Sequence, residues 1–473
     1  MENQENKPQR PVNPRRRRKS KFQIFKEAYL PFILIVLALV LVIVFIVTAV
    51  NRAKTRRAEE AAASSAAAAS SEAEQQRLDD LAAKTLAEAK SLAASYYYDE
   101  AIDKLNSFEG SIYDYDALLQ ARQSYEDLKD NLVLWNDPSK VPNLSFHLLM
   151  VDAKKAFANK QYGESFEWNF ITTDEFRGIL EQLYENGYVL VMMDDIVKVT
   201  ASSDGTYTYS AKDLYLPEGK KPLMITQTQV NYFTYMIDGS GDGMPDADGS
   251  GFASKLVVKN GVLTNEMVDD TNQTVNGEYD LVPILNSFIK AHPDFSYQGA
   301  KAVLAVCAYD GLFGYRTDPE TLTKHGAAFY ENEVADAKAL IQALRDDGYS
   351  IACYTYSNTV YGSMSASRIE ADLKKWADEV TPILGECDIL VYSKNSDISD
   401  KNTPYSGDKY DVLKKAGFKY FYGFCENYGS PWIELGSYVR QGRIMVTGNN
   451  LLDNPGMFED FFEASEIRDK LRR

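Results

Sequence analysis

The stretch LMITQTQV, residues 223–230, decides the fold expected for this chain. Met224 and Ile225 follow Lys221-Pro222 and predict a short buried strand, which turns polar at 226–229. In α/β architectures, functional groups lie where a strand ends in a loop, because rigid backbone directs side chains into a cleft there. A second edge of this kind occurs where SIACYTY (350–356) reaches Ser357-Asn358. We expect a cleft at these two edges.

Strands and helices alternate from residue 141 onward. VPNLSFHLLMV (141–151) predicts a first strand. Thr172 and Glu175 form a capping box that opens a helix over 174–186, and Gly187 ends this helix before a strand over 188–193. The succession of helix, glycine, aromatic residue and strand recurs in LIQALRDDGYSIACYTY (340–356) and DVLKKAGFKYFYGF (411–424). Repeated βα units predict a mostly parallel sheet with helices outside it.

The two strand edges resemble the first two motifs of the polysaccharide deacetylase family (carbohydrate esterase family four, the NodB homology domain). The family's first motif ends a strand with Thr-Phe-Asp-Asp-Gly or, in one extracellular branch, with Ser/Thr-Gln-Asp-Asp-Val; the second reads Ser-His-Thr-x-x-His. The flanks LPEGKKPLMIT (216–226), VNYFTYM (230–236) and GYRT (314–317) also resemble the family. The resemblance covers about residues 141–450 and implies a distorted (β/α) barrel with fewer than eight regular strands.

On that alignment, the residues that carry the family's chemistry are replaced. Thr228 stands in place of the general-base aspartate and Gln229 in place of the metal-binding aspartate, while Tyr354 and Asn358 replace the two histidine ligands. The three histidines form no His-x-x-x-His pair, and none follows position 325. Deacetylation needs a divalent metal to polarise the amide carbonyl and a base to accept a proton from water. The resemblance therefore implies a retained cleft with no catalytic residue and no metal or other cofactor.

Four further residues near predicted strand ends are candidates for ligand binding. His147 lies where the extracellular branch often has Phe-His-Ser-Leu, and a hydrogen-bonded structural histidine is the alternative. Arg316, in GYRT, matches the family pattern. Tyr392 and Lys394 lie at the end of an apolar strand, where the family has a Pro-Tyr-Gly-type turn. Lys394 either replaces the charge of the lost metal or is simply solvated.

An acidic loop, DGSGDGMPDADG (238–249), is a candidate calcium site. Calcium prefers hard oxygen ligands, and Gly243 stands where calcium loops turn sharply. Pro245 and the missing glutamate at the twelfth place depart from that pattern, so a flexible acidic loop without metal is the alternative. The candidate ligands alternate along the loop: Asp238, Ser240, Asp242, Asp246 and Asp248.

Residues 31–50, PFILIVLALVLVIVFIVTAV, predict an uncleaved membrane anchor. The segment carries no charge and is long enough for a bilayer core roughly 30 Å thick. Nine Lys and Arg residues precede it, including the run Arg15–Lys19, and four follow within 51–57. This excess predicts a cytoplasmic N-terminus and an extracytoplasmic C-terminal domain at the cell membrane. The basic run contacting nucleic acid or anionic lipid is the alternative.

The expected organisation follows from these composition changes. The Ala/Ser/Glu-rich stretch after the anchor has few large apolar side chains and cannot build a core, and two short amphipathic helices follow it. We expect a basic cytoplasmic tail (1–29), a transmembrane helix (30–50), a helical or disordered stalk (51–95), a helical neck (96–135) and the deacetylase-like domain (141–460).

Charge and cysteine usage limit the partners. The whole chain carries a net charge of −17 and residues 1–57 carry +10, so the remainder carries −27. Such an acidic domain is unsuited to nucleic acid or other polyanions. The four cysteines match no zinc pattern, and three lie in apolar strand-like runs, which favours buried free thiols.

The sequence thus predicts a membrane-anchored, extracytoplasmic, deacetylase-like pseudoenzyme whose partners are cell-wall polysaccharide and, through residues 30–50, the lipid bilayer. One alternative is a divergent zinc-dependent carbohydrate N-deacetylase with a rebuilt acidic site that includes Asp310 or Asp397. The other alternative is a scaffold or interaction protein in which the stalk and neck carry the function.

Overall fold

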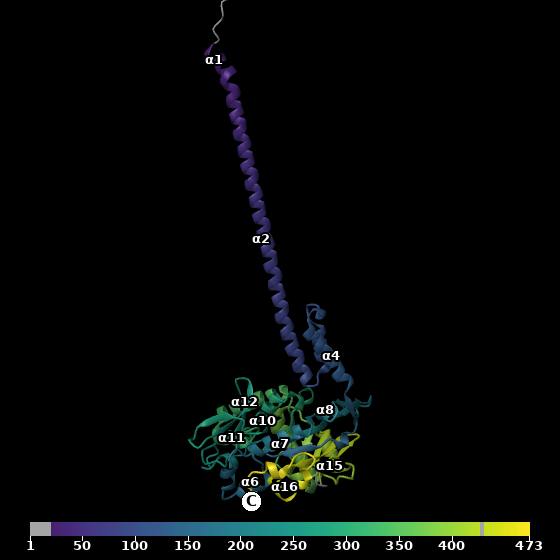
Figure 1. Cartoon of the computed structure of the whole chain (residues 1–473). Helices are drawn as coiled ribbons and strands as arrows, with labels where there is room; N and C mark the ends of the chain where they lie inside the picture. Colours follow the sequence, from purple (N-terminus) through teal and green to yellow (C-terminus); the bar gives the residue numbers. More distant parts are fainter. Residues whose placement is uncertain (1–19, 426–429) are drawn as a thin grey trace, which may run out of the picture. The chain divides into compact units, whose positions relative to one another are not determined.

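The computed structural model describes residues 20–425 and 430–473. The basic run Arg15–Lys19 and most of the predicted tail 1–29 lie outside the described residues. The chain divides into two compact units, Met1–Ala83 and Lys84–Arg473, and each is described by itself (Figure 1).

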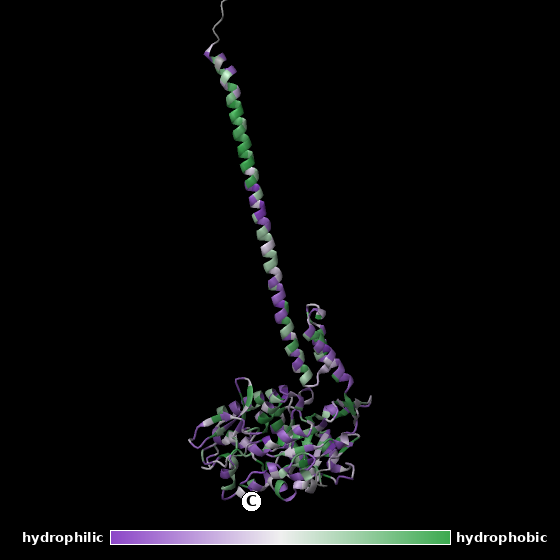
Figure 2. Cartoon of the chain, in the orientation of Figure 1, coloured by the Kyte–Doolittle hydropathy of each residue, from purple (hydrophilic) through white to green (hydrophobic). Residues whose placement is uncertain are grey.

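The N-terminal unit is helical throughout its described part. A turn of α-helix, α1 (Lys21–Ile24), and a π-helical turn, η1 (Phe25–Tyr29), lead into the long helix α2 (Leu30–Ala94). The residues of the predicted span are exposed and form a continuous apolar band along α2, followed by a mostly polar stretch (Figure 2). By length and composition, this helix is sufficient to cross a membrane. The stalk sequence is helical, in keeping with its high content of alanine.

Two helices and a tyrosine-rich turn follow α2 and belong to the second unit. These helices are α3 (Tyr98–Asn106) and α4 (Asp116–Asp130). Tyr96, which has a positive φ of 67°, is buried; its hydroxyl donates to the Asp294 carbonyl at 2.7 Å, and its ring lies 5.6 Å from that of Tyr297. The neck sequence is therefore fixed to the barrel by Tyr96 as well as by chain connectivity.

Seven parallel strands close into a barrel, which confirms the predicted α/β barrel with fewer than eight regular strands. The last strand in the series pairs again with the first, so the barrel has no open edge between them. In order around the barrel the strands are β7 (Lys221–Thr228), β11 (Val303–Val306), β12 (Ser350–Cys353), β13 (Ile389–Val391), β14 (Tyr420–Phe424), β16 (Val439–Met445) and β2 (Asn143–Phe146).

Helices cover the outside of the barrel (Figure 1). The predicted capping box is present at the start of α7, where Thr172 and Glu175 bond each other's backbone amides. Gly187, after this helix, has a φ of 79°, and a Cβ there would lie 2.8 Å from the carbonyl oxygen of Gly219. The longer covering helices are α7 (Thr173–Glu185), α10 (Leu281–Ala291), α12 (Ala327–Asp346), α13 (Ala366–Lys375) and α15 (Asp408–Lys415).

Shorter elements complete the barrel unit. A three-stranded antiparallel sheet joins β8 (Lys255–Lys259), β9 (Val262–Val268) and β10 (Thr274–Gly277). The other strands are β1 (Val133–Trp135), β3 (Tyr188–Leu190), β4 (Val197–Ala201), β5 (Tyr207–Ala211), β6 (Leu214–Leu216) and β15 (Ile433–Leu435). The shorter helices are α5 (Ala153–Phe157), α6 (Gly163–Asn169), α8 (Met193–Ile196), α9 (Thr234–Ile237), α11 (Pro319–His325), α14 (Thr381–Leu384), α16 (Gly448–Asp453) and α17 (Ala464–Ile467).

The predicted end of the strand in LMITQTQV is wrong. Strand β7 begins at Lys221 and continues through the polar residues to Thr228, which pairs with Ala305 of β11. Thr226 and Gln227 are buried, because the Thr226 hydroxyl bonds the Asn143 side chain at 2.8 Å and the Gln227 amide bonds Asp280 at 2.7 Å. Polar partners inside the barrel thus extend the strand past the point where hydrophobicity alone would end it.

Candidate functional site

The carboxyl ends of the parallel strands form one mouth of the barrel. Thr228 ends β7, His147 follows β2, and Tyr354 follows β12. The charge of Arg443, on β16, acts on His147, which is hydrogen-bonded to Thr228. The Tyr354 side chain in turn acts on the pKa of Arg443. The structure therefore brings together the two strand edges that the sequence singled out.

Thr228 and His147 form a hydrogen-bonded pair at the mouth. The Thr228 hydroxyl lies 2.8 Å from Nδ1 of His147 and 3.2 Å from the carbonyl oxygen of Phe146. Burial, followed by the charge of Arg443, lowers the pKa of His147 to about 4. The imidazole is therefore neutral at ordinary pH, and its hydrogen-bond partner is a threonine hydroxyl.

Backbone with positive φ marks the three strand ends that surround the mouth. Gln229 follows β7 with a φ of 60°, and Thr355 and Asn358 follow β12 with φ values of 62° and 49°. Lys394 and Asn395, after β13, have φ values of 51° and 55°. Such conformations are uncommon for residues other than glycine and gather at functional sites. The loops at the mouth are thus sharply turned.

The remaining motif positions bond to the loop after β13. The Tyr354 hydroxyl accepts a hydrogen bond from the backbone N–H of Lys394 at 3.2 Å, and the Asn358 side-chain oxygen accepts one from the Ser393 hydroxyl at 2.6 Å. The Lys394 side chain is exposed. Tyr392 is buried, and its ring packs against Phe421.

Arg443 supplies the cation at this mouth, and the sequence analysis missed it. The side chain is fully buried, and burial lowers its pKa to about 10, so the guanidinium stays charged at neutral pH. No carboxylate within residues 20–425 and 430–473 forms an ion pair with it. The available signal was the arginine directly before the apolar run IMV in the last strand, which also holds Arg440. Its donors reach the Gly423 and Tyr392 carbonyls (both 3.1 Å), the Ser145 hydroxyl (2.9 Å) and the Asn395 side chain (3.3 Å).

The donor set at the mouth does not fit a catalytic zinc site. Such sites use imidazole, carboxylate or thiolate ligands. The mouth offers a hydroxyl, two amides and a phenol, together with one imidazole already bonded to Thr228. In the part of the chain that the structure describes, no group of three or more His, Cys, Asp or Glu side chains is placed to hold a metal ion.

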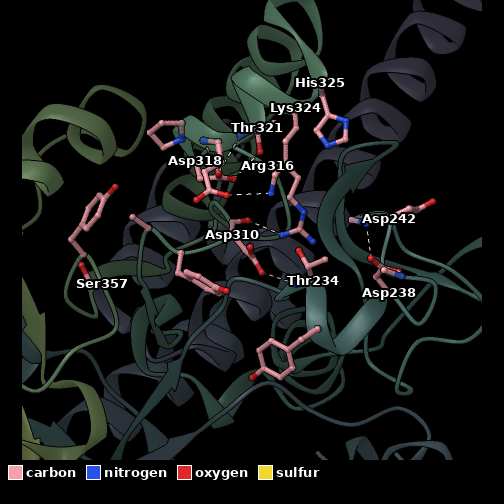
Figure 3. A pocket seen from close by; sticks show the side chains of 18 residues that line it. Thr234, Asp238, Asp242, Asp310, Arg316, Asp318, Thr321, Lys324, His325 and Ser357 are labelled. Atoms are coloured by element: carbon pink, nitrogen blue, oxygen red, sulfur yellow. Dashed lines mark hydrogen bonds and ion pairs between the residues drawn. The ribbon is translucent and has the colours of Figure 1, made fainter. Parts of the chain in front are cut away.

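A cavity of about 700 Å³ opens beside the mouth (Figure 3). Segments that follow β7, β11 and β12 line it, together with α11 and part of the acidic loop. Arg316 is nine-tenths buried at its wall and donates to the carbonyls of Asp310 (2.7 Å) and Tyr232 (3.0 Å). The Asp310 carboxylate accepts the backbone N–H of Thr234 at 2.8 Å. The lining residues include Thr234, Tyr235, Asp238, Asp242, Tyr309, Asp310, Arg316, Asp318, Glu320, Thr321, Lys324, His325, Tyr356 and Ser357.

The acidic loop is ordered by its own backbone. The Asp238 carboxylate accepts the N–H groups of Gly241 (2.6 Å) and Gly243 (2.5 Å). Asp246 accepts those of Gly239 and Ser240; although burial opposes it, these bonds lower the pKa of Asp246. Calcium binding by this loop stays a prediction.

Asp397, the second carboxylate of the enzyme alternative, is bound in an ion pair. Its oxygens accept hydrogen bonds from Arg440 at 2.9 Å and from the Tyr405 hydroxyl at 2.6 Å. Burial raises the pKa of Asp397, although the charge of Arg440 opposes this. The structure thus places Asp310 at the cavity and Asp397 in a buried network with Arg440.

Comparisons with solved structures give five matching chains, two of which are the following. The Streptococcus pyogenes deacetylase PplD, in complex with acetate, is 14% identical with a TM-score of 0.34; the match covers 66% of this chain and 95% of that one. A de-N-acetylase from Aggregatibacter actinomycetemcomitans is 11% identical with a TM-score of 0.35, covering 68% and 99%. No protein-family model and no curated protein matches the sequence. The fold assignment above rests on the pairing of the strands.

Proposed function

We propose that this protein is a membrane-anchored, extracytoplasmic barrel that binds cell-wall glycan without hydrolysing it. The observation that carries the proposal is the contrast between the mouth and its neighbouring cavity. At the mouth, the motif positions hold neutral side chains bonded to neighbouring groups. Beside it, a cavity of about 700 Å³ lies open. Its volume falls within the roughly 300–1,000 Å³ that is usual for ligand sites.

The chemistry of the cavity suits a saccharide. Tyr235, Tyr309 and Tyr356 line it, and tyrosine offers both an apolar face for the C–H groups of a sugar ring and a hydroxyl for hydrogen bonds. Tyr309 is 60% exposed, so its ring is accessible to a large ligand. Thr234 and Ser357 add hydroxyl groups at the wall (Figure 3).

Catalytic silence is supported by the same residues. Hydrolysis of an amide needs an activated water and a base near the scissile carbonyl. Neutral His147 is bonded to Thr228, and the Arg443 guanidinium has its donors engaged with protein acceptors. Of the two carboxylates of the enzyme alternative, Asp397 is ion-paired with Arg440, and Asp310 accepts the backbone N–H of Thr234.

Cosedimentation of the detergent-solubilised full chain with insoluble wall polysaccharide tests the proposal. We expect binding that chelator leaves unchanged, and no release of acetate from N-acetylated oligosaccharides. Tyr309→Ala should weaken binding at least tenfold. Tyr113→Ala, in the neck and 71% exposed, is the matched control and should bind normally.

Three results would contradict the proposal. Stoichiometric zinc with acetate release would establish the enzyme alternative. Absence of wall binding would remove the glycan function. Wall binding that is lost in Tyr113→Ala and kept in Tyr309→Ala would favour the scaffold alternative, in which the neck carries the interaction.

A further inference from the structure

The cavity beside the mouth carries an excess of negative charge. Five carboxylates line it, and two cationic side chains, Arg316 and Lys324, stand against them. Figure 3 shows that these groups come from different sides, with Asp238 and Asp242 across the cavity from Ser357 and with Asp318 near Lys324. The carboxylates are Asp238, Asp242, Asp310, Asp318 and Glu320.

Both cations are already balanced. Lys324 lies 3.2 Å from Glu320 in an exposed ion pair. Arg316 donates a hydrogen bond to the backbone carbonyl of Asp310. Burial lowers the pKa of Arg316, and the negative charge of Asp310 is the largest influence that opposes this lowering. Two of the five carboxylates are thus matched by a cation of the cavity.

The three other carboxylates bond to neutral donors. Asp238 accepts backbone amides of the acidic loop, and Asp242 accepts the N–H of Met244 at 2.9 Å. Asp318 caps α11 by accepting the N–H groups of Glu320 and Thr321. Such bonds fix the orientation of a carboxylate without neutralising it. The cavity therefore presents about three uncompensated negative charges to a ligand, which favours a cation.

The tyrosines of the cavity decide which kind of cation fits. An accessible ring such as Tyr309 attracts both the C–H face of a sugar and a nearby ammonium group. The charge of Asp310, followed by burial, raises the pKa of the Tyr309 hydroxyl. The negative charge of Asp310 therefore acts directly on this ring. A sugar that carries its own ammonium group satisfies both features at once.

We infer that the cavity binds amino-sugar units whose amine is free and protonated, in preference to N-acetylated units. The inference rests on the proposed glycan function and specifies its ligand. A deacetylated amino sugar brings one positive charge per unit to the uncompensated aspartates, whereas an acetamido group brings none.

Binding of two matched probes tests this inference. Oligomers of β-1,4-linked glucosamine and of N-acetylglucosamine, equal in length, are titrated by calorimetry into the detergent-solubilised full chain, with chelator present to exclude calcium from the acidic loop. We expect the glucosamine oligomer to bind at least tenfold more tightly at pH 6 and low salt. This preference should shrink as salt screens the charges.

Charge-removing variants locate the preference. In Asp242→Asn with Asp318→Asn, the side-chain oxygens that accept the backbone bonds remain, and asparagine is a good N-cap, so the fold is retained. This double variant should lose most of the preference. The control removes the same charge outside the cavity: Asp130→Asn with Asp408→Asn, which should keep the preference.

The possible results separate this inference from the proposed function. Equal binding of both oligomers, or tighter binding of the acetylated one, overturns the inference and leaves glycan binding in place. Failure of both oligomers to bind, while a lysine-rich peptide binds, overturns both. A preference that Asp242→Asn with Asp318→Asn leaves unchanged also overturns the inference, because the charge would then act from elsewhere.

Discussion

Removal of Arg472 should destabilise the barrel unit far more than its position next to the last residue suggests. The guanidinium forms a two-pronged ion pair with Glu175 of α7, with Nε–Oε1 and Nη2–Oε2 distances of 2.6 Å. Both side chains are almost completely buried, with exposed fractions of 0% and 1%. Arg472 also donates to the carbonyls of Glu167 and Phe170. The barrel's packing thus continues past residue 460.

The magnitude follows from what the substitution leaves behind. In Arg472→Ala, the Glu175 carboxylate stays buried with the backbone N–H groups of Thr172 and Asp469 as partners but with no counter-charge. Breaking a buried ion pair from one side costs about 3–5 kcal/mol. We therefore expect Arg472→Ala to lower the free energy of unfolding by about that amount.

Urea unfolding of the full chain in detergent, followed by tryptophan fluorescence, measures this loss. Arg473→Ala is the matched control, because the Arg473 side chain is exposed and its backbone N–H makes the bond to Glu167; we expect a change within about 0.5 kcal/mol. Glu175→Gln combined with Arg472→Met removes both charges and keeps an acceptor for the capping box, so part of the loss should be recovered. A loss below about 1 kcal/mol in Arg472→Ala would refute the reasoning.

Three further outcomes test the mouth and the acidic loop. The pKa of His147 is about 4 in the folded chain and about 6.5 in the unfolded chain. The free energy of unfolding should therefore fall as the pH drops from about 6.5 to 4, because only the unfolded chain takes up the proton in that range. The expected loss is about 2 kcal/mol after allowance for partial exposure of the ring. His147→Gln should flatten this dependence in urea midpoints, and a pKa near 6.5 by NMR would contradict it. Calcium should raise the thermal midpoint of EGTA-treated protein, and Asp242→Ala should abolish this rise; an unchanged midpoint in the parent chain would mean that the loop needs no metal. Zinc affinity, measured by calorimetry, should appear when the family's donors are installed, and its absence would contradict the alignment; the substitutions are Thr228→Asp, Gln229→Asp, Tyr354→His and Asn358→His.

The sequence alone predicted a mostly parallel sheet with helices outside it, because the signals for βα units are local, whereas closure into a barrel was implied by the family resemblance. The capping box of α7 spans four residues, and Gly187 follows directly after the helix. Each apolar strand can likewise be recognised from the pattern of a few neighbouring residues. Local periodicity therefore suffices for element type and for a parallel sheet, and it also predicted that Thr228 and Tyr354 would lie at one mouth.

What the tertiary structure alone decided is the environment of the polar residues. Gln227 is buried within β7 because it bonds Asp280, 53 positions away, and Thr228 bonds His147 across 81 positions. Arg443 is buried at the mouth, where it donates a hydrogen bond to Ser145, 298 positions away. Lys394, by contrast, is exposed. A polar side chain enters the interior only where distant segments supply its partners, and those pairings are set by closure of the barrel rather than by neighbouring residues.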